Sequence, residues 1–484
     1  MVFSSLTLSA FLCIFLPIVV ILYGIFPVKW RNFLLLAASL VFYAWGEPRY
    51  ILIMLFSTVF DYINGRLIEY YDMQQKQKAK KRVVMVSIVG NLGILAFFKY
   101  TDMLIVSWNQ ITASNLSLLK IALPIGISFY TFQTMSYTID VYRGLVKAQR
   151  NLISFGMYVC MFPQLIAGPI VRYQTIADQI DERKENNAVW VAGMQRFILG
   201  LAKKVILANQ IGRLWEEIST TQMAQLSTAG AWLGAIAYTF QIYFDFSGYS
   251  DMAIGLGKMF GFTFPENFKH PYESKSITEF WRRWHITLST WFREYVYIPL
   301  GGNRKGLKRQ IVNLLIVWFL TGLWHGASWN FVLWGLYYFV LLVIEKVFLL
   351  AKMQRWPRVL QHFYALFFIV TGWVVFAIED FHKMGQYLLV MFGLRGSWIN
   401  NTAQYQWCTY AFFLMILVAA STTICSKVWN RIRRHMIREE ADFVREKGLH
   451  AEFILKSVIS VLLLAVSLAM LVAGSFNPFL YFRF

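Results

Sequence analysis

One histidine, His325, stands inside a long apolar run of the chain, residues 311–344. Basic segments flank this run on both sides, at residues 304–309 and 346–358. Lysine and arginine gather in cytoplasmic loops, so the run is expected to enter the membrane and return. An ionisable residue at membrane depth is by default a functional candidate. The alternative for His325 is a packed imidazole bonded to a backbone carbonyl.

The run around His325 is too short for two complete crossings, which need about 40 residues. Residues 311–322 would rise only about 18 Å as a helix, against a hydrocarbon core of about 30 Å. Gly322 and Gly326 are therefore expected to place the turn, and His325 with it, within the bilayer. Irregular backbone at that depth must be buried in protein or line a cavity.

Two carboxylates, Asp245 and Asp251, follow directly on an apolar stretch at residues 229–243. They are either catalytic acids or structural partners of nearby arginines or tyrosines. A charged side chain buried at such a point costs several kcal/mol unless it has an ion-pair partner. The structural interpretation is therefore preferred.

A second histidine, His285, lies in a helix that a capping box at residues 276–279 is expected to open and that runs to about Arg293. Aromatic and apolar side chains recur on one face of this helix, which indicates a helix lying at the membrane interface. His285 lies on that buried face. Considered alone, it is as consistent with an ordinary packed histidine as with a functional one.

The composition predicts an all-α polytopic membrane protein. Of 484 residues, 57% are hydrophobic and 15% charged, whereas soluble domains carry about 25% charged residues. We expect roughly 11 transmembrane helices of about 20 residues each, with re-entrant and interfacial helices. Residues 6–25 are interpreted as a retained span, because no basic residue precedes them. Residues 162–169 contain two prolines and a glycine and are expected to form a buried re-entrant turn.

The net charge of +20 comes from short loops between apolar runs, such as residues 75–82 and 427–434. This distribution favours cytoplasmic loops and anionic lipid over nucleic acid as its cause. Both termini are then expected outside the cytoplasm, with a basic helix at residues 426–447 inside and an aromatic tail at 476–484 outside. The four cysteines show neither disulfide nor zinc spacing.

Several segments together resemble the membrane-bound O-acyltransferase family. The similarity is greatest to its bacterial branch of alginate O-acetylation membrane subunits and peptidoglycan O-acetyltransferases, and more distant to the teichoic acid D-alanyl transferases. It covers nearly the whole chain, in order. The segments that carry it are residues 162–173, 243–251, 279–285, 297–303 and 323–326.

The resemblance implies one transmembrane domain over residues 1–484, with helices around a central funnel. Within it we expect N-terminal spans, a family core that holds both histidines, C-terminal spans and an outer tail. Their boundaries are residues 1–150, 151–345, 346–475 and 476–484.

The resemblance also assigns the chemistry. His325 is the essential histidine and takes the proton of an attacking hydroxyl, which is a poor nucleophile when neutral. His285 orients the acyl group or stabilises the oxyanion. The tail resembles the acyl-accepting end of the small peptide that accompanies the teichoic acid enzyme, so Tyr481 is a candidate covalent carrier. An interfacial aromatic belt is the alternative for the tail.

The expected function is O-acetylation of an extracytoplasmic polysaccharide, such as alginate or a cell-wall glycan, from cytoplasmic acetyl-CoA. We expect a bacterial inner-membrane location, no metal and no bound cofactor, with the residues that bind acetyl-CoA unidentified. The expected partners are the lipid bilayer, export machinery and an extracytoplasmic acetyltransferase- or esterase-like protein. The alternatives are a lipid or protein O-acyltransferase of the same family, a polysaccharide transporter and an export scaffold. A transporter should show inverted repeats, and none is found in the sequence.

Overall fold

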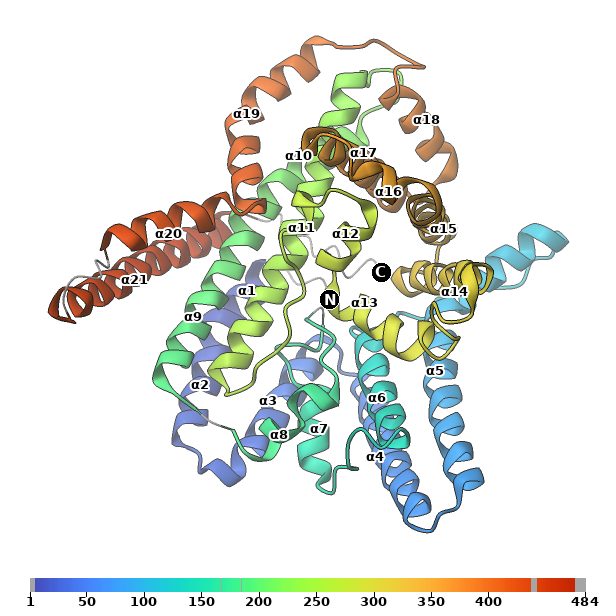
Figure 1. Cartoon of the computed structure of the whole chain (residues 1–484), viewed down its shortest axis with the longest axis vertical. Coiled ribbons are helices and arrows are strands. Elements are labelled where there is room, and N and C mark those ends of the chain that lie inside the picture. Colours follow the sequence, from blue (N-terminus) through green and yellow to red (C-terminus); the bar gives the residue numbers. More distant parts are fainter. Residues whose placement is uncertain (1–4, 167, 184, 437–441, 475–484) are drawn as a thin grey trace. The chain divides into compact units, whose positions relative to one another are not determined.

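The computed structural model is all-helical over the residues that it describes, 5–166, 168–183, 185–436 and 442–474 (Figure 1). This confirms the predicted fold class. The helices group into two compact units, each built from separate stretches of the chain. The described residues of Met1–Phe197 and Met252–Glu266 form the first unit, and those of Ile198–Asp251 and Asn267–Leu480 form the second. The single-domain division stays a prediction.

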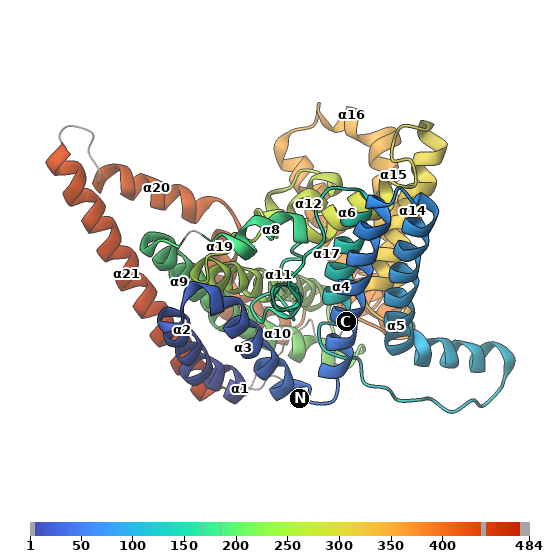
Figure 2. The same cartoon turned by 90° about the horizontal axis from the view of Figure 1, so that it is seen from below.

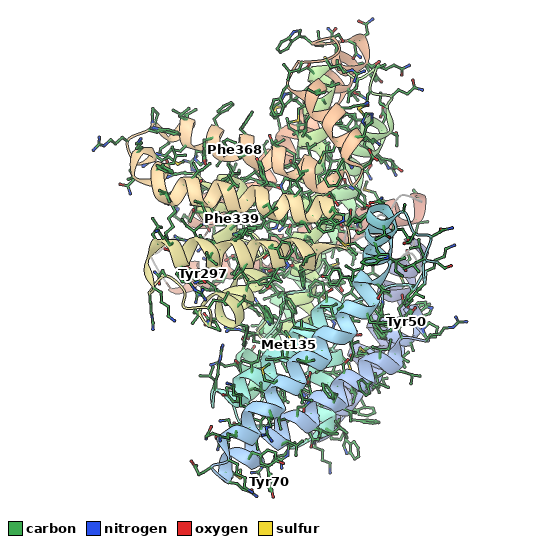
Figure 3. The ribbon with its side chains drawn as sticks, turned by 90° about the vertical axis from the view of Figure 1, so that its right-hand side faces the viewer. Tyr50, Tyr70, Met135, Tyr297, Phe339 and Phe368 are labelled. Carbon is green, nitrogen blue, oxygen red and sulfur yellow. The ribbon has the colours of Figure 1, made fainter. Side chains whose placement is uncertain are left out.

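Three long helices, α4 (Ile51–Met73), α5 (Gln77–Thr112) and α6 (Ile127–Tyr142), pack on one another in the first unit (Figure 2). Figure 3 marks Tyr50 and Tyr70 near the two ends of α4, and Met135 on α6. The other helices wholly within this unit are α1 (Ser5–Ala10), α2 (Leu16–Ile25), α3 (Arg31–Gly46), α7 (Leu152–Cys160) and α8 (Tyr173–Asp181). Two further helices belong to both units, α9 (Asn187–Ala202) and α11 (Thr228–Met259).

In the second unit, α14 (Gly306–His325) and α15 (Trp329–Ile344) form a helical hairpin and pack extensively on each other. Helix α17 (Arg358–Ala377) packs beside α15, and Figure 3 shows Phe339 and Phe368 on these two neighbouring helices. The remaining α-helices of the unit are α10 (Asn209–Thr220), α12 (Ile277–Arg283), α13 (Ile286–Phe292), α16 (Leu350–Met353), α18 (Phe381–Met391), α19 (Asn401–Ser421), α20 (Ile424–Met436) and α21 (Asp442–Ala473).

Seven helical stretches among the described residues are long and apolar enough to cross a membrane. This agrees with a polytopic membrane protein, whereas the expected count of roughly 11 spans is not confirmed. The seven stretches are Leu8–Ile25, Ile51–Met73, Gln77–Thr112, Trp329–Met353, Arg358–Ala377, Asn401–Ser421 and Leu449–Ala473.

Three local expectations about the helices can be compared with the structure. Residues 161–166 form a buried turn without a regular helix, as the prolines predicted. The carboxylate segment 243–251 continues the apolar stretch 229–243 within one 32-residue helix, α11. The expectation of one continuous basic helix over residues 426–447 is wrong, whereas its cytoplasmic location stays a prediction. Helices α20 and α21 pack on each other (Figure 1). Arg433 of α20 pairs with Glu452 of α21.

Candidate active site

His325 is the last residue of α14, where the hairpin turns. Gly326 after it has extended backbone, and α15 begins three residues later at Trp329. The imidazole is buried, with 5% of the residue exposed. Its ring centroid lies 4.9 Å from that of Trp334 on α15 and 5.3 Å from that of Phe376 on α17. Three helices thus fix the surroundings of His325.

The α14–α15 hairpin holds His325 in position because the backbones of the two helices approach closely at glycines. A Cβ on Gly335 would lie 2.3 Å from the carbonyl oxygen of Trp318. On the facing helix, a Cβ on Gly322 would lie 2.5 Å from the carbonyl oxygen of Phe331. Small residues allow such close packing of helices. The end of α14, and His325 with it, is therefore held tightly against α15.

The predicted reason for placing His325 within the bilayer is wrong. Helix α14 begins at Gly306, five residues before the apolar run, and its 20 residues rise about 30 Å. Gly322 lies inside the helix and not at the turn. Since α14 is about as long as the hydrocarbon core is thick, shortness gives no argument for depth. The depth of His325 in the membrane stays a prediction.

His285 lies between two short helices, so the expected continuous helix from residue 276 to Arg293 is wrong. The predicted cap is present, because Ser276 Oγ accepts a hydrogen bond from the backbone N–H of Glu279 at 3.0 Å. Helix α12 then ends at Arg283, and His285 takes the left-handed conformation with φ 43° and ψ 53°. This region is uncommon for a residue other than glycine and costs about 1–3 kcal/mol. The surrounding contacts must therefore enforce it.

Asn267 supplies those contacts. Its backbone oxygen accepts from the N–H of Ile286 at 2.9 Å, and its side-chain Oδ1 lies 3.1 Å from His285 Nδ1. The same Oδ1 accepts from Thr287 through its hydroxyl at 2.9 Å and its N–H at 3.3 Å. On its other side, Asn267 Nδ2 donates to Ser250 Oγ of α11 at 3.1 Å. One buried amide thus fixes the backbone around His285 and the orientation of its ring.

The two histidines contact a common indole, that of Trp324. Its ring centroid lies 5.8 Å from that of His285 and 5.1 Å from that of His325. His285 also contacts Phe246 of α11, with ring centroids 4.6 Å apart. The structure therefore brings His285 and His325 together within one aromatic cluster of the second unit. The two histidines are 40 residues apart in the sequence, and the path of α12, α13 and α14 places both beside Trp324.

His285 lies outside the seven candidate spans and is 1% exposed. Burial lowers the pKa of His285 well below its usual value, and the charge of His325 lowers it further. Both effects disfavour the imidazolium. Burial therefore favours the neutral imidazole of His285, the form that can accept a proton.

Asp245 and Asp251 are ion-paired, which supports the structural interpretation over catalytic acids. The ion-pair partners are lysines, whereas we expected arginines or tyrosines. Lys204 Nζ lies 2.5 Å from Asp245 Oδ1, and both side chains are almost completely buried. Lys203 Nζ lies 2.6 Å from Asp251 Oδ2 in a more exposed pair. Both pairs join the π-helical segment Lys203–Ala208 to α11.

Two supporting residues were missed in the sequence. Asn267 lies 18 residues before His285, and no spacing rule connects the two. Glu345 is fully buried, and its carboxylate accepts from the backbone N–H groups of Ile277 at 2.6 Å and Thr278 at 2.8 Å. It thereby satisfies the first turn of α12, where a negative charge is favourable. The sequence signal that could have identified Glu345 is an acidic residue at the end of an apolar run.

Tyr481, the candidate covalent carrier, lies outside the described residues.

Comparison with known proteins decides the family. The model of the membrane-bound O-acyltransferase family matches residues 22–381, a range that includes both histidines. The chain belongs to the membrane-bound O-acyltransferase family. The resemblance noted in the sequence is thus confirmed, and the chain is an O-acyltransferase enzyme of the membrane.

Three relatives of this O-acyltransferase show how far the similarity extends. A probable alginate O-acetylase of Azotobacter vinelandii is 38% identical over the full length of both chains. The corresponding protein of Pseudomonas aeruginosa is 44% identical over 82% of this chain and 76% of its own. A peptidoglycan O-acetyltransferase of Helicobacter pylori is 31% identical over 95% of this chain and 92% of its own.

Proposed function

We propose that this O-acyltransferase carries acetyl groups from cytoplasmic acetyl-CoA to hydroxyl groups of an extracytoplasmic polysaccharide. The names of its relatives support a polysaccharide as the acceptor. These relatives are alginate and peptidoglycan O-acetylating proteins, and they align over most or all of this chain. We place it in the inner membrane of a bacterium, with both termini outside the cytoplasm. The excess of basic residues in loops supports this orientation.

The observation that carries the proposal is the buried pair of imidazoles at Trp324. A hydroxyl attacks a thioester poorly unless a base removes its proton as the new bond forms. In the proposed reaction, the hydroxyl oxygen bonds to the thioester carbonyl carbon and its proton passes to the histidine pair. The bond from carbon to sulfur then breaks, and the CoA thiolate takes up the proton. We assign His325 as the indispensable member of this pair.

The same chemistry accommodates a covalent carrier. If the hydroxyl of Tyr481 is the first acceptor, only an acetyl ester has to reach the outer side, and CoA stays in the cytoplasm. A second hydroxyl, on the polymer, then displaces Tyr481 from the ester. The sequence contains no GxSxG motif, so we assign this last step to an extracytoplasmic esterase-like partner associated with polysaccharide export.

The test is polymer acetylation in cells that carry His325→Ala. We expect acetylation to be lost while the amount of folded protein in the membrane is unchanged, because the substitution removes the base and leaves the hairpin glycines in place. Chemical release of acetate from purified polymer measures the result. Retained acetylation contradicts the proposed role of His325.

Two further experiments test the length of the acyl chain and the role of Tyr481. Competition between thioesters of increasing chain length should favour acetyl, whereas a lipid or protein acyltransferase prefers a long chain. Tyr481→Phe keeps the aromatic ring and removes only the hydroxyl, so we expect transfer to stop. Unimpaired transfer would show that the tail serves only as an interfacial anchor.

A further inference from the structure

We infer that Asn267 is the positioning residue of His285, and that its amide leaves His285 Nε2 as a proton-accepting atom of the acyl transfer. The inference rests on the proposed function, in which His285 acts beside His325. It replaces the expectation that His285 stabilises an oxyanion. It also assigns a role to a side chain that no sequence motif singled out.

The hydrogen bonds determine which atom of the Asn267 amide faces His285. The backbone N–H of Thr287 can only donate, and it lies 3.3 Å from the same side-chain atom that contacts the imidazole. That atom must therefore be the oxygen, with the amide nitrogen turned to Ser250 Oγ. An amide oxygen only accepts, so His285 Nδ1 carries a hydrogen and donates it to Asn267.

A neutral imidazole has one N–H, and in His285 that group is committed to Asn267. Nε2 consequently presents a bare lone pair. It is buried and has no hydrogen-bond partner among the residues that the structure describes. A buried polar atom without a partner is costly and calls for an explanation. A hydroxyl proton of an acyl acceptor would satisfy this atom. An oxyanion would not, because Nε2 has no hydrogen to give.

The surroundings keep the ring neutral and oriented. Phe246 of α11 and Trp324 of α14 pack against it through apolar surface. Asn267 holds the ring without adding charge, whereas a carboxylate there would favour the imidazolium. His325 on α14 is the titratable side chain whose charge acts on His285. A proton leaving the attacking hydroxyl can therefore be accepted at Nε2 of His285.

The assignment can be measured without any enzymatic activity. In protein carrying 15N-labelled histidine, the nitrogen spectrum distinguishes a protonated ring nitrogen from a bare one, and a matched His285→Gln sample identifies the signals of His285. We expect Nδ1 of His285 to be protonated and Nε2 to be bare in the wild-type chain at pH 7. The opposite tautomer would overturn the inference.

Two substitutions then separate positioning from a merely structural role. In Asn267→Asp, a carboxylate oxygen still accepts from Nδ1, and its charge stabilises the imidazolium. We expect the acid limb of the pH profile of kcat to move up by about one unit. In Asn267→Ala the ring loses its partner. We expect kcat to fall about 10- to 100-fold, the range for losing the partner of a metal-bound imidazole, with KM for acetyl-CoA unchanged.

Ser250→Ala is the matched control. It removes the contact on the nitrogen side of the same amide and leaves Oδ1 on His285, so the tautomer and the pH profile should stay those of the wild type. An unshifted profile in Asn267→Asp, with protein that elutes as folded in detergent, contradicts the inference. If the wild-type chain transfers no acetyl group but shows the expected tautomer, the proposed function fails while the assignment of the ring nitrogens stands.

Discussion

Gly335→Ala tests whether the α14–α15 hairpin positions the histidine pair. The added Cβ would lie 2.3 Å from the Trp318 carbonyl oxygen and 3.3 Å from Gly322 Cα. Neither atom belongs to a flexible side chain that could turn away. The Cβ must reach at least 3.0 Å, so the two backbones have to separate locally by about 0.7 Å. Overpacking of this kind costs about 1–3 kcal/mol, partly offset by about 1 kcal/mol of helix propensity gained over glycine.

The expected functional effect is larger than the effect on stability. Trp334, next to Gly335 on α15, contacts the His325 ring at 4.9 Å, so a shift of α15 displaces the wall beside this imidazole. A misplacement of about 1 Å can cost about 100-fold in rate. We therefore expect Gly335→Ala to lower kcat for acetyl transfer about 100-fold, with a much smaller loss of thermal stability.

The assay is release of the CoA thiol from acetyl-CoA by membranes that carry the variant, retain the extracytoplasmic partner and contain the acceptor polysaccharide. Gly385→Ala on α18 is the matched control, because a Cβ at Gly385 meets nothing within 4 Å. We expect this control to keep its activity. If Gly335→Ala is as active as Gly385→Ala, the hairpin does not position the histidines and the reasoning fails.

Two further predictions concern stability. Lys204→Met removes the ion-pair partner of the buried Asp245 carboxylate and should cost about 3–5 kcal/mol, whereas Lys203→Met breaks a more exposed pair and should cost much less. Thermal unfolding in detergent compares them, and equal losses would contradict the importance of burial. The lowered pKa of His285 means that the unfolded chain takes up its proton first as pH falls below about 6.5. The wild-type Tm should therefore drop between pH 7 and pH 5 more steeply than that of His285→Gln, and parallel curves would argue against a neutral His285.

Much of the fold follows from local sequence signals. The apolar composition alone predicts helices, since backbone groups in hydrocarbon must bond internally. The cap at Ser276 and the turn at residues 161–166 were also predictable, because Ser–Glu spacing and proline act on neighbouring residues. The break at His285 was not predictable, since its amphipathic pattern continues through the residue and a distant amide enforces the left-handed turn.

In the candidate site, too, some features were predictable from the sequence and others were not. His325 stood out because an ionisable residue in an apolar run is costly and therefore rare. The Asp245 and Asp251 pairs were expected on the same ground of charge, but their lysine partners were not, because the sequence does not show which helix faces α11.

The sequence by itself determined that this chain is a helical membrane protein with two histidines of interest, because burial energy and local backbone rules depend on residue type and spacing. Only the tertiary structure decided that those histidines share Trp324 and that Asn267 fixes the proton on one of them. Such contacts depend on how distant helices pack, and a hydrogen bond across 18 residues leaves no periodic trace in the chain.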